Sequence, residues 1–156
     1  DLIVSSSISI QPTSPYMLEY GTVRVTIENQ GTVAAPQFYV SLFIDRTPGV
    51  NKGYESRYED KQLVSSLDAG ASKTLSWTNY FNSAGNHTLY VYVDSNGVSD
   101  YYGAVLESDE TNNVSDPLVV VVRSWYSGAS PDGNGSSEGW GDVQSIEPEK
   151  ISAPDD

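Results

Sequence analysis

The sequence predicts an all-β fold, a sandwich of about seven antiparallel strands. Apolar and polar residues alternate in several short runs, and this period of two is typical of strands with one buried face. Turn-forming stretches such as Asn29-Gln30-Gly31 and Ala84-Gly85-Asn86 separate the runs. No run within residues 1–123 has the period of an α-helix.

The predicted strands follow one another along residues 1–123. The alternation is strictest in the second run, where Val23, Val25 and Ile27 share one face. The long polar segment from Arg46 to Lys61 is predicted to be a loop with room for one weak edge strand. The expected strands are Leu2–Ile10, Thr22–Glu28, Gln37–Asp45, Ser72–Trp77, His87–Asp94 and Leu118–Arg123.

The same alternation predicts the hydrophobic core. Side chains two positions apart in a strand point to the same side of the sheet, so each apolar series is expected to face inward. The expected core residues are Val23, Val25, Ile27, Phe38, Val40, Leu42, Leu75, Trp77, Leu89, Val91 and Val93.

Charge and composition exclude several classes of protein. The 156 residues carry a formal net charge of −13, which repels nucleic acid phosphates and anionic lipids, so neither is an expected partner. No run approaches the roughly 18 apolar residues of a membrane span, so membrane insertion is not expected. The chain has no cysteine, which excludes disulfides and thiolate metal sites. Because the chain begins at Asp1 without a signal peptide, we interpret it as a module of a longer protein or a processed product.

Residues 124–156 differ in composition from the rest. They are rich in Gly, Ser and Pro and contain seven acidic residues against a single lysine. Such a composition cannot bury enough apolar area to offset the entropy of ordering, so a flexible acidic C-terminal tail is expected. Trp125, Tyr126 and Trp140 leave open the alternative that part of it docks on the sandwich. The predicted division is therefore a domain at 1–123 and a linker or tail at 124–156.

Four motifs occur in a fixed order along the predicted domain. They are D-L-I-V from Asp1, T-V-R-V-T-I-E-N-Q-G-T-V-A-A from Thr22, L-D-A-G-A-S-K-T-L from Leu67, and V-D-S-N-G from Val93 followed by E-S-D-E-T-N-N from Glu107. In this order they resemble a CARDB domain, the cell-adhesion-related domain of bacterial and archaeal surface proteins. The resemblance covers residue 1 to about residue 123. It implies an immunoglobulin-like or fibronectin-III-like sandwich that is repeated in large extracellular proteins. Residues 46–61 and the stretch G-V-S-D-Y-Y-G-A from Gly97 depart from the family pattern.

Oxygen-bearing side chains are concentrated between the last two predicted core strands. In an immunoglobulin-like sandwich these residues lie at one pole, where Asp45 at the end of a neighbouring strand is expected to reach them. Calcium prefers six to eight carboxylate, amide and carbonyl oxygens, which irregular loops can supply. The alternative is a structural turn, because Asn and Asp tolerate left-handed backbone and bond to their own chain. The candidate metal ligands are Asp94, Asn96, Glu107, Asp109, Glu110, Asn112 and Asn113.

Aromatic residues form the second candidate site. If the apolar series faces the core, then Tyr39, Phe43, Tyr90 and Tyr92 point out of the sheet from two neighbouring strands. An exposed aromatic patch of this kind suits sugar rings or another protein surface. The alternative is ordinary cross-strand pairing, or cover by the tail.

The sequence offers little support for catalysis. His87 is the only histidine, and no G-x-S-x-G nucleophile motif occurs. The chain is therefore predicted not to be an enzyme but a spacer or adhesion module at the cell surface or in a secreted protein, with calcium as a candidate cofactor. Its expected partners are neighbouring domains of the parent protein and a protein or glycan surface. The alternative function is a carbohydrate-binding module attached to a secreted enzyme.

Overall fold

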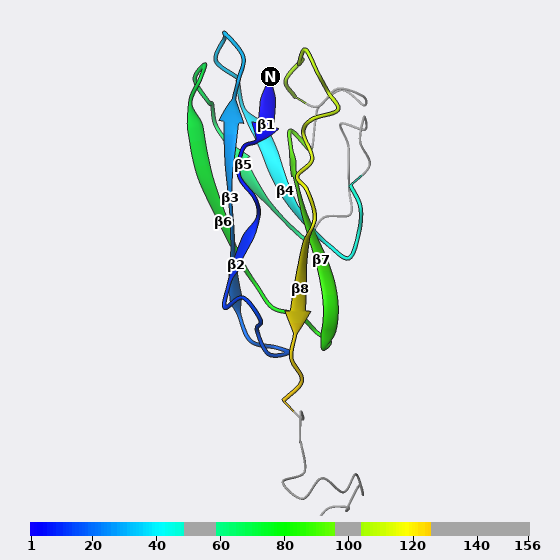
Figure 1. The fold of residues 1–156 in the computed structure, drawn as a ribbon. Helices are drawn as coiled ribbons and strands as arrows, with labels where there is room; N and C mark the ends of the chain where they lie inside the picture. The colour runs from blue at the N-terminus through cyan, green and yellow to red at the C-terminus, as the bar shows by residue number, and fades with distance from the viewer. Residues whose placement is uncertain (49–58, 96–103, 126–156) are drawn as a thin grey trace, which may run out of the picture.

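The computed structural model describes residues 1–48, 59–95 and 104–125, and it confirms the predicted all-β sandwich. Two antiparallel sheets of four strands each face one another (Figure 1). The first sheet contains β1 (Leu2–Val4), β2 (Ser9–Gln11), β3 (Gly21–Asn29) and β6 (Ser72–Asn79). The second sheet has the order β5 (Asp60–Val64), β4 (Phe38–Ile44), β7 (Gly85–Val93) and β8 (Leu118–Val122).

Strand β3 is the centre of the first sheet. It pairs with β6 from Gly21↔Asn79 to Glu28↔Ser72, while β2 and β1 lie one after the other along its opposite edge. The single strand predicted over 2–10 is wrong, because the serines between β1 and β2 interrupt it. The backbone N–H groups of Ser5 and Ser6 both donate to the Thr26 carbonyl, and the Ser6 hydroxyl accepts from the Thr26 N–H. The Ser6 hydroxyl thus takes the place of the backbone carbonyl that would accept from the Thr26 N–H in a regular sheet.

The second sheet contains the strand that the sequence placed least well. Strand β5 occupies Asp60–Val64 and pairs with β4 from Leu42↔Asp60 to Phe38↔Val64. The weak edge strand expected within residues 46–61 therefore lies at the end of that segment and continues to Val64. The division of the expected strand 2–10 into β1 and β2 brings the described residues to eight strands. Strand β5 has an irregular burial pattern as an edge strand, so it lacks the strict alternation that identifies the others.

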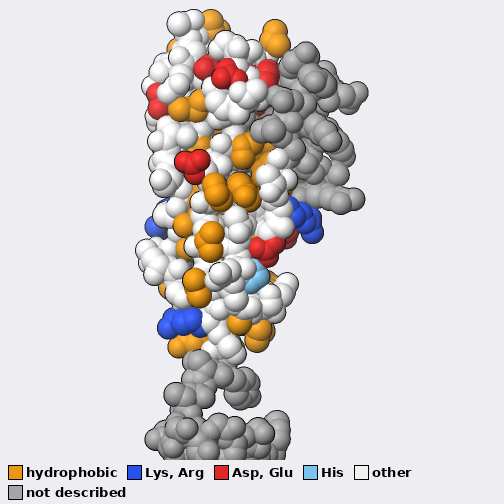
Figure 2. Space-filling view, turned by 45° about the vertical axis from the view of Figure 1, so that its right-hand side comes forward, with side chains coloured by type: hydrophobic (Ala, Val, Ile, Leu, Met, Phe, Trp, Pro, Cys, Tyr) orange, Lys and Arg blue, Asp and Glu red, His pale blue; other side chains and the backbone are white. Residues whose placement is uncertain are grey.

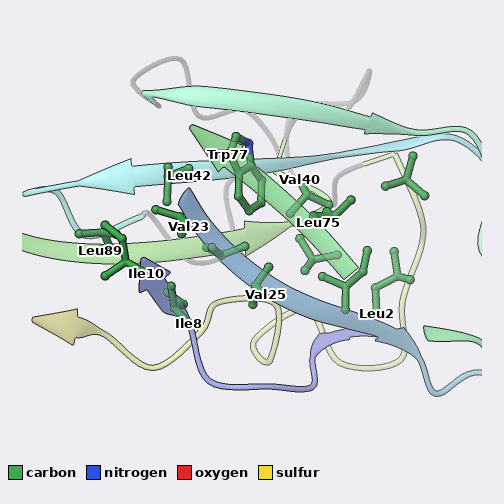
Figure 3. Packing of buried hydrophobic residues seen from close by; sticks show 14 of the residues in the cluster. Leu2, Ile8, Ile10, Val23, Val25, Val40, Leu42, Leu75, Trp77 and Leu89 are labelled. Carbon is green, nitrogen blue, oxygen red and sulfur yellow. The ribbon is translucent and has the colours of Figure 1, made fainter. Parts of the chain in front are cut away.

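The core lies between the two sheets, as predicted. All eleven expected core residues are buried, and Figure 3 shows several of them, including Trp77, Val40 and Leu42, packed between strands of both sheets. Strands β1 and β2 add Leu2 and Ile10 to this cluster. The period-two alternation was therefore sufficient to assign the inward face of every long strand.

The sandwich is elongated, and its two ends carry different parts of the chain (Figure 1). We call one end the N-terminal pole; it contains Asp1, the turn at 29–36 and the loop 104–113. The other end, the C-terminal pole, contains residues 16–20, 45–46, 80–84 and 123–125. Strand β7 runs from the C-terminal pole to the N-terminal pole, because its first residue pairs with the end of β8 and its last with β4.

The first residues of the predicted tail contact the sandwich at the C-terminal pole. The ring of Trp125 stacks on Tyr16 with 4.5 Å between ring centroids, and its Nε1–H donates to the Met17 carbonyl at 2.7 Å. The guanidinium of Arg123 lies 3.9 Å from the centroid of the Tyr16 ring. Residues 126–156 lie outside the described residues, so the flexible tail and the domain boundary stay predictions.

Candidate functional site

Asp94 holds the loop 104–113 onto the end of β7. Its backbone has a φ of 54°, a left-handed conformation that Asp tolerates better than most residues. Asp94 is only 1% exposed. Its carboxylate accepts hydrogen bonds from the N–H groups of Ala104 and Val105, each at 2.8 Å. Asp94 is therefore an anchor of the loop as well as a candidate ligand.

The far end of the same loop is tied to β7 by backbone hydrogen bonds. The Val93 N–H donates to the Asn113 carbonyl at 2.9 Å, and the Ser115 N–H donates to the Val91 carbonyl at 2.9 Å. The Ser115 hydroxyl accepts from the Val91 N–H at 2.9 Å. Because both ends are fixed, the side chains of 107–113 are gathered over the end of β7.

Glu107 connects this loop to the first strand. One carboxylate oxygen, Oε2, accepts from the Leu2 N–H, and the other, Oε1, accepts from Asn113 Nδ2 at 2.9 Å. The N–H of Glu107 itself donates to Glu110 Oε1 at 3.0 Å. Glu107, Glu110 and Asn113 thus form one hydrogen-bonded group, in which Glu110 is bound through the backbone N–H of Glu107. Figure 2 shows acidic side chains gathered at the upper end of the molecule.

Two asparagines in this group have amide oxygens without a donor. Asn113 is 2% exposed, and its Oδ1, like the buried Oδ1 of Asn112, has no hydrogen-bond partner among the residues that the structure describes. Each amide uses its nitrogen to bind a carboxylate: Asn112 donates to Asp1 Oδ1 at 3.2 Å and Asn113 to Glu107. An unsatisfied buried acceptor costs about 1–3 kcal/mol, so a group that satisfies these oxygens would stabilise the fold.

Asn29 shows how a structural asparagine at the same pole differs. Its Nδ2 donates to the carbonyls of Val33 and Leu67, both at 2.9 Å, and its Oδ1 accepts from the Gly31 N–H at 3.0 Å. Every polar atom of this buried side chain has a partner, as is usual in folded proteins. The two unpartnered oxygens beside the carboxylates are therefore not a general property of asparagines at this pole.

Burial shifts the acidity of two carboxyl groups in the cluster. Desolvation raises the pKa of Asp94 to about 6 and that of Glu107 to about 7, although hydrogen bonds from neighbouring N–H groups act in the opposite direction. The negative charge of Glu110 adds to both increases. A bound cation would relieve the cost of ionising these groups, since it favours the charged form.

The structure does not bring all seven predicted ligands together. Asp109 is exposed and uses Oδ1 to accept from the Thr111 N–H at 2.8 Å and hydroxyl at 2.6 Å, and these hydrogen bonds lower its pKa. This geometry matches the structural-turn alternative for Asp109. Asn96 lies outside the described residues. Among the described residues, no three Asp, Glu or His side chains are placed to hold a metal ion by themselves.

The expectation that Asp45 reaches this cluster is wrong. Asp45 follows β4, and the antiparallel pairing Ile44↔Leu89 places the end of β4 beside the first half of β7, at the C-terminal pole. Its carboxylate accepts from the Thr88 N–H at 2.9 Å and lies 2.6 Å from His87 Nδ1. Burial opposes ionisation of Asp45, but the hydrogen bonds from Thr88 and His87 and the charge of His87 outweigh it and lower its pKa.

The Asp45–His87 pair continues to Ser83 in an order that resembles a hydrolytic triad. His87 Nε2 lies 3.4 Å from the Ser83 hydroxyl but 2.9 Å from the Ser83 carbonyl oxygen. A carbonyl can only accept, so Nε2 carries a hydrogen and cannot take a proton from the hydroxyl. The arrangement is a structural hydrogen-bond chain. Sequence reasoning missed it because 42 residues separate Asp45 from His87.

Removing the Asp45 carboxylate is expected to destabilise the C-terminal pole. Asp45→Ala leaves the Thr88 N–H and the His87 ring without their acceptor, so we expect the free energy of unfolding to fall by about 1–3 kcal/mol in urea denaturation. Asp68→Ala, which removes an exposed carboxylate, is the control and is expected to change it by less than about 0.5 kcal/mol. Equal effects of the two variants would contradict the assigned role.

The exposed patch of four aromatic rings is not formed as predicted. Phe43 is 1% exposed and Tyr92 is 3% exposed, so two of the four rings are buried although they point away from the core between the sheets. Tyr39 and Tyr90 are half-buried, and Lys61 Nζ lies 4.4 Å from the centroid of the Tyr39 ring. Alternation predicts which face of a sheet a side chain occupies, but not what covers that face. A binding role for Tyr39 and Tyr90 stays a prediction.

Comparison with known proteins places the sandwich in a family. The model of the CARDB family matches residues 1–117. No curated protein is similar enough in sequence to be counted as a relative. In the described part of the chain, no helix could cross a membrane.

Solved structures agree with this match. A CARDB domain from Pyrococcus furiosus, in complex with di-metal ions, superposes with a TM-score of 0.59 at 23% identity, over 79% of this chain and 88% of that one. A domain of a protein assigned to the cell surface of Methanosarcina acetivorans has a TM-score of 0.52 at 28% identity, over 79% and 91%. A β-glucosidase from Erythrobacter marinus contains a similar domain, with a TM-score of 0.51 and 13% identity over 79% of this chain and 15% of that one. The likenesses below 25% identity show the fold alone.

Proposed function

The chain belongs to the CARDB family, and from that premise we propose that it is a non-catalytic spacer or adhesion module of a larger extracellular protein, with a calcium ion stabilising its N-terminal pole. Its partners are then the neighbouring domains of that protein and a protein or glycan surface. The elongated sandwich supports a spacer role, because Asp1 and the end of β8 lie at opposite poles (Figure 1). The similar domain of the Methanosarcina acetivorans protein, assigned to the cell surface, supports the location.

The observation that carries the calcium proposal is the unpartnered Oδ1 of Asn113, buried beside Glu107. Together with Asn112 Oδ1 and the carboxylates of Glu107 and Glu110, it supplies the neutral and charged oxygens that calcium prefers. The raised pKa of Glu107 indicates that ionising this group without a cation is unfavourable. The Pyrococcus furiosus domain in complex with di-metal ions supports a metal at this kind of fold.

Calcium is expected to stabilise the folded protein. Extracellular modules bind calcium with dissociation constants of about 0.1–1 mM. A ligand at one hundred times its dissociation constant adds about 2.7 kcal/mol of stability. At about 10 mM calcium, which is about ten to one hundred times such constants, the added stability is about 1.4–2.7 kcal/mol. We therefore expect the melting temperature to rise by about 3–10 °C, with reversal by EDTA. Magnesium should act poorly, because it demands strict octahedral geometry.

Glu110→Gln is the variant that tests the site. Glutamine keeps an oxygen that can accept from the Glu107 N–H but lacks the negative charge, so the loop should fold while the calcium response is lost. Asp116→Asn removes an exposed charge three residues beyond Asn113 and serves as the control. If calcium produced neither a heat of binding in titration calorimetry nor a change in melting temperature, the calcium proposal would be wrong and the structural-turn interpretation would hold.

A further inference from the structure

Two acceptor motifs for N-linked sugars lie within the described residues, and the fold treats them differently. Such a motif consists of an asparagine, any residue except proline, and then a serine or threonine. It occurs as N-H-T at residues 86–88 in β7 and as N-V-S at residues 113–115, where the loop 104–113 ends. Because so short a motif also occurs by chance, its accessibility in the fold decides whether it can carry a sugar.

The fold buries the motif at residues 113–115. Asn113 is 2% exposed, and its Nδ2, the atom that would carry the sugar, donates to Glu107 Oε1 at 2.9 Å. The hydroxyl of Ser115 is also used, because it accepts from the Val91 N–H at 2.9 Å. A sugar on Asn113 would break the bond to Glu107 and force the loop off the end of β7. A folded chain therefore cannot carry a sugar at this position.

The motif at residues 86–88 faces solvent. Residues two apart in a strand share a face, so Asn86 and Thr88 both point outward, while His87 between them is buried. Asn86 is exposed and Thr88 is half-buried. In the described part of the chain, neither of these two side chains has a hydrogen-bond partner. A sugar on the amide nitrogen of Asn86 would therefore break none of the contacts that hold the fold.

The strand beside this motif has an exposed apolar face. Strand β8 is the last strand of its sheet and lies next to β7 (Figure 1). Asn86 pairs with Val121 and Thr88 pairs with Val119, so the four side chains stand on one face of the sheet. Val121 is 54% exposed and Val119 is 57% exposed. A sugar on Asn86 would cover part of an apolar edge strand, a kind of surface that otherwise favours association between chains.

We propose that Asn86 is the acceptor of an N-linked sugar. In this reaction Asn86 Nδ2 forms a bond to the anomeric carbon of a sugar that a lipid-linked phosphate carries. The bond from that carbon to the phosphate oxygen breaks, the lipid phosphate leaves with the electron pair, and the nitrogen releases a proton. The Thr88 hydroxyl completes the motif that the transferase recognises. The inference rests on the proposed extracellular function, because only an exported chain meets such a transferase.

The test examines the protein that its own cells export. Cleavage before aspartate separates the two motifs, because it gives one peptide of residues 68–93, with Asn86, and another of residues 109–115, with Asn113. Mass spectrometry with electron-transfer fragmentation then identifies the asparagine that carries the sugar. We expect a sugar on Asn86 and none on Asn113.

Two variants at one position make the test specific. Thr88→Ala destroys the motif but keeps Asn86 and the hydrogen bond from the backbone N–H of residue 88 to Asp45, so the variant should fold and be exported without the sugar. Thr88→Ser keeps the motif and should keep the sugar. If the exported wild type carries no sugar on Asn86, or carries one on Asn113, or if Thr88→Ala keeps the sugar, the inference is overturned while the extracellular function stands. If the protein is not exported, both are overturned.

Discussion

Replacing Trp77 by alanine is expected to lower the free energy of unfolding by about 3–5 kcal/mol, a large share of the stability of an ordinary domain. Trp77 is 2% exposed and lies in the core between the sheets, where its partner in the neighbouring strand is Val23 (Figure 3). The substitution leaves a cavity that the surrounding strands cannot fill, because both sheets are fixed by their ladders. Urea denaturation followed by far-ultraviolet circular dichroism gives the value.

Two further tryptophan variants make this prediction specific. The Nε1–H of Trp77 is buried without a hydrogen-bond partner among the described residues, so Trp77→Phe loses volume but also removes an unsatisfied donor. We expect it to cost less than about 2 kcal/mol. Trp125→Ala removes a tryptophan that is 59% exposed and should cost about 1 kcal/mol. A similar cost for Trp77→Ala and Trp125→Ala would show that the core is not organised around Trp77.

In EDTA, the protein is expected to become less stable as the pH rises from about 4 to 7. The folded pKa values of Asp94 and Glu107, about 6 and about 7, exceed the reference values of 3.8 and 4.5 for these groups. Between those values the folded protein retains protons that the unfolded chain has released, so the unfolded chain gains relative stability. The full contribution is present below pH 3.8 and is lost once the pH exceeds about 7.

At about 1.4 kcal/mol per pKa unit, the two raised pKa values set an upper limit of about 6 kcal/mol, and solvent screening of both groups reduces the expected effect to the order of 2 kcal/mol. That corresponds to a fall in melting temperature on the order of 5 °C. Asp45 and Asp109 have lowered pKa values and titrate below this range. Repulsion within a chain of net charge −13 acts in the same direction, so the quantity to compare is the slope of the wild type against that of Glu107→Gln.

Glu107→Gln should reduce the slope of melting temperature against pH, and saturating calcium should flatten it in the wild type, because a cation favours the ionised carboxylates. A slope that is unchanged by Glu107→Gln would contradict the raised pKa of that residue. If saturating calcium leaves the slope of melting temperature against pH unchanged in the wild type, calcium does not bind to the ionised carboxylates of Asp94 and Glu107.

The fold could be predicted from the sequence wherever one face of a strand is buried along its whole length. In β3 the alternation of Val23, Val25 and Ile27 determined both the strand and its inward face. It failed at the first strands, because the break between β1 and β2 depends on the hydroxyl of Ser6, a local bond that leaves no periodic signal. The weak edge strand expected within residues 46–61 was placed only approximately, because β5 is an edge strand whose burial does not alternate strictly.

The candidate site could be predicted only as a region. Counting oxygen-bearing residues located the loop that contains Glu107 and Asn113, but could not distinguish Asp109, which bonds to its own turn, from residues that face the cluster. The hydrogen bond from Asn112 to Asp1 depends on the pairing of β1 with β3, which joins residues far apart in the sequence. The position of Asp45 was wrong for a related reason, because only the register of β4 and β7 shows which pole it occupies.

The placement of Asp1 and Trp125 at opposite poles has a mechanical consequence (Figure 1). A force that pulls these two residues apart acts along the strands. The hydrogen bonds that join β1 to β3 and β8 to β7 are perpendicular to the strands. Such a force therefore loads all the hydrogen bonds of each strand together in shear, and they do not open one by one. Strand β1, with three residue pairs against five for β8, is the weaker of the two. The contact of Glu107 with the Leu2 N–H lies at the point where that force enters the sandwich.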